Sequence, residues 1–196
     1  MHITQSYIGT VKEPFKCLFF LLLEDYIEAQ TNFARELDLL LERFARNLGN
    51  SAALVRPFTG DIDAIREQVL DKKWSYKELK EVQNTPALLM INQDFDSFSP
   101  REHPWLIVNL GRRVTDYYGG QSQFDHLLNE LVEVVLNADE DFFVAANKLK
   151  HEIQATEGAK LFEAKPGIFG FSINLFYALG ILKKIYAQMR GAQNIS

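Results

Sequence analysis

The sequence predicts a mixed, helix-rich α/β domain with a small sheet of three to five strands. A long stripe of apolar residues near the N-terminus, spaced as in an α-helix, predicts a dominant first helix. Short apolar runs bounded by turn residues, at 52–58, 87–91 and 105–110, predict strands. Amphipathic segments between these runs predict helices that cover the sheet.

The N-terminal stripe is the strongest of these signals. Its apolar residues are separated only by steps of three and four, which places them on one face of a helix. Pro14 is tolerated in a first helical turn and Gly49 is typical of a helix end, so we expect one helix over 14–48. Such a helix has to bury its stripe against other elements or a second chain. The stripe comprises Phe15, Phe19, Leu22, Tyr26, Ala29, Phe33, Leu37, Leu40, Phe44 and Leu48.

The following segments predict the sheet. Strand 52–58 leads into a helical pattern over 61–72, and a second helix begins at Ser75, where Glu78 three residues later would complete a capping box. We expect strands 52–58 and 87–91 to be parallel neighbours joined by a right-handed crossover. The 105–110 strand is expected beside 87–91.

The remaining segments extend the same domain. Apolar periodicity predicts a helix from Ser122 to Val135, and a glycine-containing strand follows at 166–173. The last helix is expected over 174–190, packed on the sheet like the first. Because no repeat or linker divides the chain, we expect a single domain over 1–196, with a sheet-containing body at 52–173.

Composition narrows the class of protein. The net charge of −5 argues against a general nucleic-acid binder, which needs many Lys and Arg. Cys17 is the single cysteine, so no intramolecular disulfide forms, and a reducing compartment is favoured. Cys17 begins a seven-residue apolar run, far shorter than the ~20 residues of a membrane span. These observations predict a cytoplasmic protein without a membrane span and a buried Cys17 thiol.

The polar loop 92–104 is the strongest candidate for chemistry. It follows the carboxyl end of an apolar strand, where open α/β sheets usually bind ligands. Asp94 and Asp96 carry hard oxygens of the kind Mg²⁺ prefers, and Glu102 lies nearby in the sequence. His103 changes its charge near neutral pH and would carry a proton. These four residues form the candidate catalytic set.

The same loop has a structural interpretation, which the sequence favours. Asp, Ser and Pro are turn formers, and Asp94 and Asp96 would then cap local N–H groups. Phe95 and Phe98 alternate with these polar residues and would fix the loop to the core.

Elsewhere, the glycines of 166–171 lack the spacing of a phosphate-binding loop, and the sequence contains no zinc-binding or catalytic-nucleophile pattern. We therefore expect neither a cofactor nor a bound metal.

The function favoured by these observations is a non-enzymatic interaction or regulatory module. It would self-associate, as a dimer, or dock on a protein partner through an aromatic-rich helical surface. The expected partner-binding residues are Phe33, Leu37, Leu40 and Phe44, since a small sheet cannot cover the whole stripe. Two alternatives stay open: a metal-dependent hydrolase or phosphate-handling enzyme centred on the 92–104 loop, and a small-ligand sensor.

Overall fold

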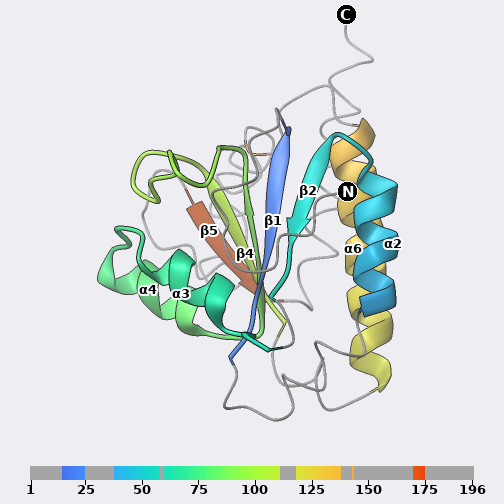
Figure 1. Ribbon diagram of the computed structural model, residues 1–196, viewed down its shortest axis with the longest axis horizontal. Coiled ribbons are helices and arrows are strands. Elements are labelled where there is room, and N and C mark those ends of the chain that lie inside the picture. The colour runs from blue at the N-terminus through green and yellow to red at the C-terminus, as the bar shows by residue number, and fades with distance from the viewer. Residues whose placement is uncertain are drawn as a thin grey trace, which may run out of the picture.

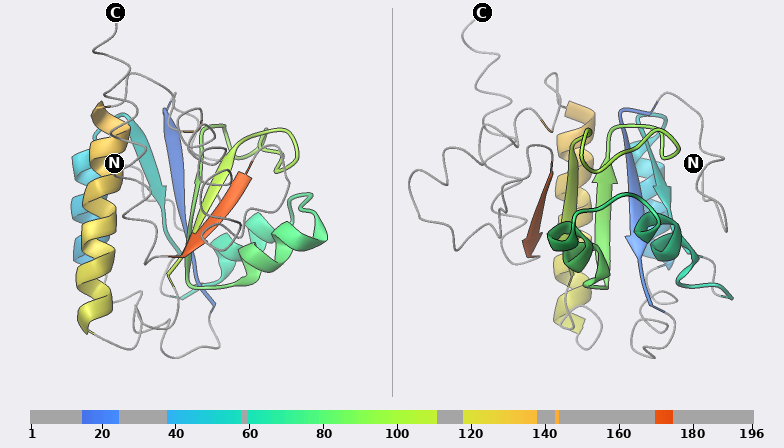
Figure 2. Two further views of the ribbon diagram at one scale, coloured as in Figure 1. Left: turned by 180° about the vertical axis from the view of Figure 1, so that it is seen from behind. Right: turned by 90° about the vertical axis from the view of Figure 1, so that its left-hand side faces the viewer.

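The computed structural model describes residues 15–24, 38–57, 60–110, 118–137, 143 and 170–174. These residues form a mixed α/β fold in three layers, with α2 and α6 on one side of a sheet and α3 and α4 on the other (Figures 1 and 2). The strands are β1 (Cys17–Leu22), β2 (Ala52–Val55), β3 (Ala87–Ile91), β4 (Trp105–Asn109) and β5 (Gly170–Asn174). The helices are α2 (Asp38–Leu48), α3 (Ala64–Leu70), α4 (Tyr76–Gln83) and α6 (Tyr118–Asn137).

The sheet has five strands in the order β2-β1-β3-β4-β5. Its centre is antiparallel, since β3 runs opposite to both β1 and β4. Its two outer pairs are parallel, β1 with β2 and β4 with β5. The expected mixed sheet and the neighbouring positions of β3 and β4 are therefore confirmed. The predicted C-terminal helix lies outside the described residues, apart from Asn174, which ends β5.

The predicted helix over 14–48 is wrong at residues 17–22. Residues 17–22 form the strand β1, and within the described part of this range the segment from Asp38 to Leu48 is the helix. The error has a physical cause: every residue of β1 is buried, so its two faces together give a continuous apolar run. A continuous run fits the helical period as well as the strand period. The end of the helix is confirmed, because Gly49 has a φ of +58° and follows the last helical residue.

The predicted parallel crossover between 52–58 and 87–91 is also wrong. β1 lies between β2 and β3, parallel to the first and antiparallel to the second. The two strands are consequently antiparallel to each other and not neighbours. The prediction failed because it assigned residues 17–22 to a helix and so left the sheet without its β1 strand.

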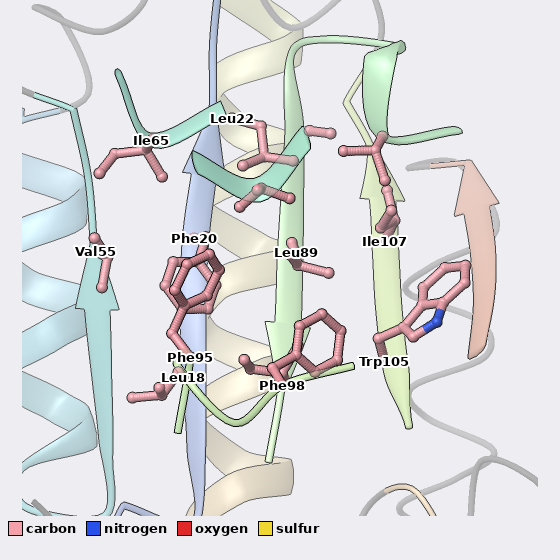
Figure 3. Close-up of a cluster of buried hydrophobic side chains, with 14 of the residues drawn as sticks. Leu18, Phe20, Leu22, Val55, Ile65, Leu89, Phe95, Phe98, Trp105 and Ile107 are labelled. Carbon is pink, nitrogen blue, oxygen red and sulfur yellow. The ribbon is translucent and has the colours of Figure 1, made fainter. Parts of the chain in front are cut away.

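The core occupies both faces of this sheet. Side chains alternate along β1, so Leu18, Phe20 and Leu22 lie on the face covered by α3 (Figure 3). Phe19 lies on the opposite face, where its ring meets Phe44 of α2 edge to face at 5.2 Å. Cys17 is buried, as predicted. None of the described helices is both long enough and apolar enough to cross a membrane.

Substitution of Leu48 tests whether the C-terminal end of α2 is packed against the core. A helix end usually frays, but Leu48 is fully buried. We expect Leu48→Ala to lower the free energy of unfolding by about 2–3 kcal/mol, in the lower part of the range for buried leucines because a helix end partly collapses into the cavity. Chemical denaturation measures this loss, with the exposed neighbour Asn47→Ala as the control. Equal losses for the two variants would contradict the packing of this helix end.

Candidate functional site

The 92–104 loop joins β3 to β4, and its position differs from the predicted one. Because β3 is antiparallel to β1 and β4, the carboxyl end of β3 lies at the edge where those two strands begin. Open α/β sheets bind ligands at the carboxyl ends of their parallel strands. For this sheet that is the opposite edge, where β1 and β4 end. The 92–104 loop therefore does not lie where an open α/β sheet usually binds its ligand.

Aromatic side chains fix the loop onto the sheet. Phe95 and Phe98 are buried, with 7% and 3% of their surface exposed. The Phe95 ring lies 5.4 Å from that of Phe20 in β1, and the Phe98 ring lies 5.9 Å from that of Trp74. Both rings are seen against the strands in Figure 3. The structural interpretation of these two phenylalanines is confirmed.

The polar groups of the loop bond to the loop itself. The Ser97 hydroxyl donates to the backbone carbonyl of Asp94 at 3.0 Å. The backbone N–H of Ser99 donates to Nδ1 of His103 at 3.0 Å, and the N–H of His103 returns a bond to the carbonyl of Ser99 at 2.9 Å. Since Nδ1 accepts a hydrogen bond, the proton of a neutral His103 lies on Nε2. His103 thus holds a turn closed.

The candidate catalytic residues do not form a metal-binding group. Asp94, Asp96 and Glu102 are exposed, and His103 is half-buried. Among the described residues, which include all four, no three His, Cys, Asp or Glu side chains are grouped so that they could hold a metal ion. The expected caps by Asp94 and Asp96 are also wrong, since no hydrogen bond within the described part of the chain reaches either carboxylate. Backbone groups and Ser97 form the turn instead.

Replacing the two aspartates tests this arrangement. We expect Asp94→Asn and Asp96→Asn each to change the free energy of unfolding by no more than about 0.5 kcal/mol, as for other surface positions. Saturating Mg²⁺ should leave the melting temperature of the wild type unchanged. A bound metal would instead stabilise the fold by ~2.7 kcal/mol at a hundredfold excess over Kd. A rise with Mg²⁺ that the double Asn variant abolishes would restore the hydrolase hypothesis.

Lys72 is a loop contact that the sequence did not predict. Its Nζ donates to the backbone carbonyls of Phe95 at 2.5 Å and of Asp96 at 3.4 Å. The same ammonium lies 4.2 Å from the centroid of the Phe95 ring. Burial lowers the pKa of Lys72 from its ordinary value of 10.5, and the nearby charge of Asp96 partly opposes this shift. Lys72 therefore connects the loop to the end of α3.

This shift gives stability a distinct pH dependence. Lys72 loses its proton at a lower pH in the folded protein than in the unfolded chain, so the unfolded state binds more protons between the two pKa values. The stability of the wild type should therefore rise relative to Lys72→Met as the pH increases toward 10.5. Denaturation at a series of alkaline pH values measures the difference, with Lys73→Met as the control. A difference that stays constant or shrinks over this range would contradict the prediction.

A second polar cluster lies at the opposite edge of the sheet, and no motif in the sequence predicts it. Glu24 follows β1, and its Oε1 forms a salt bridge with Nη2 of Arg66 in α3 at 3.1 Å. The Thr85 hydroxyl donates to Oε2 of Glu24 at 3.1 Å. The Arg66 and Glu24 side chains are only 12% and 14% exposed. Both carboxylate oxygens are occupied, so this cluster ties β1 to α3 and to the segment that precedes β3.

The predicted partner-binding stripe is only partly described. Phe33 and Leu37 lie outside the described residues. Leu40 is half-buried. Phe44 is 2% exposed and packs against Phe19, so its ring is not presented to a partner on the surface of one chain. The prediction assigned residues 17–22 to a helix. They instead form the strand β1, and its Phe19 buries the Phe44 side of α2.

Helix α4 presents an exposed aromatic side chain instead. Its start is the predicted capping box: the Ser75 N–H donates to Oε2 of Glu78 at 2.7 Å, and the Glu78 N–H donates to the Ser75 hydroxyl at 3.3 Å. Trp74 Nε1 donates to the carbonyl of Val69 at 2.7 Å and so holds the two helices together. Tyr76 follows this cap and is 74% exposed.

Charged residues surround Tyr76. Lys77 and Lys80 are exposed and form a basic stripe along α4, and the Lys80 ammonium lies 4.7 Å from the Tyr76 ring centroid. Glu67 and Asp71, both exposed, form an acidic stripe at the end of α3. We call Tyr76 together with these two stripes the α3–α4 surface.

Comparison with known proteins gave no match: no protein-family model, curated protein or solved structure is significantly similar to this chain.

Proposed function

We propose that this chain is a non-enzymatic protein-interaction module that binds its partner through the α3–α4 surface. The observation that carries the proposal is the exposure of Tyr76. Among the described residues, Tyr76 and Leu136 are the large hydrophobic side chains that remain exposed, at 74% and 41%. Tyrosine is enriched at protein interfaces because it offers a large apolar area together with a polar tip.

The surroundings of Tyr76 support the proposal. The capping box and the Trp74 hydrogen bond fix the helix that carries it, so little further ordering is needed when a partner binds. The lysines beside it supply charge for orientation and fast association. Of the phenylalanines that suggested an aromatic surface, Phe19, Phe20, Phe95 and Phe98 are buried in the core.

The two alternative functions receive no such support. No observation in the described residues favours a hydrolase centred on Asp94, Asp96, Glu102 and His103, whose side chains form no metal-binding group. A small-ligand sensor likewise has no feature of the described residues in its favour. Both stay predictions from the sequence.

Site-specific photo-crosslinking tests the proposal. A photoreactive phenylalanine at position 76 should form a crosslink to a protein, in the purified chain or in cell extract. The crosslink should disappear when Lys77→Glu and Lys80→Glu are added. The same photoreactive residue at His126, which is exposed on α6, is the control and should give only background. Equal yields from the two positions, or no crosslink from position 76, would contradict the proposal.

A further inference from the structure

We propose that the partner of the α3–α4 surface is a second copy of this chain. The two copies would meet about a two-fold axis, with the acidic stripe of each lying against the basic stripe of the other. This inference rests on the proposed function, since it names the occupant of the same surface. It is carried by the charge pattern of the two helices and by their position in the fold.

The charged side chains of the two stripes form no ion pair with one another or with the other residues that the structure describes. In the part of the chain that the structure describes, no salt bridge or hydrogen bond involves the side-chain charges of Glu67, Asp71 or Lys77. Lys80 contacts the ring of Tyr76 and no carboxylate. The surface thus presents opposite charges side by side that are available to a second molecule.

The same pattern is self-complementary. In a two-fold interface each residue pair occurs twice, because residue i of one copy meets residue j of the other and the reverse. A surface with one acidic and one basic side satisfies this condition when a copy is turned by 180°. α3 and α4 cover the same face of the sheet, so their exposed sides both point away from it (Figures 1 and 2). α3 of one copy can then lie against α4 of the other.

The size of the α3–α4 surface determines the affinity that we expect for the dimer. α3 and α4 have 7 and 8 residues, so each is roughly 10–12 Å long. A stable interface usually buries about 800 Å² on each partner, which two such short helices do not supply. Tyr76 provides an apolar centre for the interface, and the charged stripes orient the two copies relative to each other. We expect a weak dimer whose affinity falls as salt is added.

Charge reversal on either stripe should abolish this dimer. One variant carries Lys77→Glu and Lys80→Glu, so that both of its stripes are acidic. The other carries Glu67→Lys and Asp71→Lys, so that both are basic. In each variant like charges face each other at two symmetric positions. We expect dimerisation, measured by analytical ultracentrifugation, to weaken by about a hundredfold or more in both.

Mixing the two variants provides the decisive measurement. In a heterodimer of one acidic and one basic copy, both symmetric contacts pair opposite charges, so an equimolar mixture should dimerise like the wild type. A single chain carrying all four substitutions has its stripes exchanged and should also form a homodimer. Only an interface in which α3 faces α4 of the other copy predicts both recoveries.

Two further comparisons complete the test. Raising the salt from about 0.1 M to about 1 M shortens the Debye length from about 10 Å to about 3 Å and should dissociate the wild-type dimer. Arg43→Glu with Arg46→Glu changes the net charge by the same amount on α2, on the other side of the sheet, and should leave dimerisation unchanged. A monomeric wild type at low salt, unaffected reversal variants, or a mixture that fails to dimerise would overturn the inference. A monomer that still crosslinks to another protein from position 76 would overturn this inference and leave the proposed function standing.

Discussion

Replacing Phe20 by alanine should lower the free energy of unfolding by about 4 kcal/mol, the largest loss expected for a single substitution in this chain. Phe20 lies in β1, which has a neighbour on each side, and no part of its side chain is exposed. Its ring also contacts Phe95, so the substitution leaves a cavity under the 92–104 loop as well as in the sheet. Urea denaturation monitored by circular dichroism measures the loss.

Two further variants check the cause of this loss. Phe20→Leu keeps part of the buried volume and should lose less than Phe20→Ala. Tyr76→Ala removes an aromatic ring of similar size from an exposed position and should change stability by no more than about 0.5 kcal/mol. Comparable losses at positions 20 and 76 would contradict the placement of residues 17–22 in a covered strand.

Breaking the Glu24–Arg66 ion pair should give the second large loss. Glu24→Gln leaves the Arg66 guanidinium largely buried without its counter-charge, which we expect to cost about 3 kcal/mol. This value is at the lower end for buried pairs because the two side chains are still 12% and 14% exposed. Equilibrium denaturation at neutral pH measures the change.

A matched ion pair on the surface provides the control. Arg43 and Asp125 form a salt bridge at 2.6 Å, with 54% and 35% of their side chains exposed. Asp125→Asn should therefore cost no more than about 1 kcal/mol. Removing both charges of the buried pair, with Glu24→Gln and Arg66→Met, should recover much of the loss from Glu24→Gln alone. Equal losses for the buried and the surface pair would contradict the structure at this edge of the sheet.

The sequence predicted those features that depend on neighbours along the chain. The capping box of Ser75 and Glu78 is recognisable from its spacing and forms as expected. β3 and β4 are recognisable as short apolar runs, and they pair as neighbours because only one loop separates them. The burial of Phe95 and Phe98 follows from their alternation with polar residues.

Features that depend on distant residues were not predictable. The contact of Lys72 with the carbonyl of Phe95 spans 23 residues, and that of Thr85 with Glu24 spans 61. Nothing in the residue types at these positions indicates their partners. β1 escaped detection for a different reason, since burial on both faces removes the alternation that identifies a strand. Because β1 was missed, β3 was expected to run parallel to β2. This expectation placed the 92–104 loop at the wrong edge of the sheet.

The position of β1 in the sheet also has a consequence for synthesis of the chain in the cell. Its segment Cys17–Leu23 is entirely apolar and carries neither charge nor proline, the composition typical of aggregation-prone strands. It is translated well before its antiparallel partner, since Leu22 pairs with Ala87. Until β3 has been made, one edge of β1 has no strand to pair with, and other nascent chains compete for it. Chaperone binding to residues 17–23 would protect the growing chain during this interval.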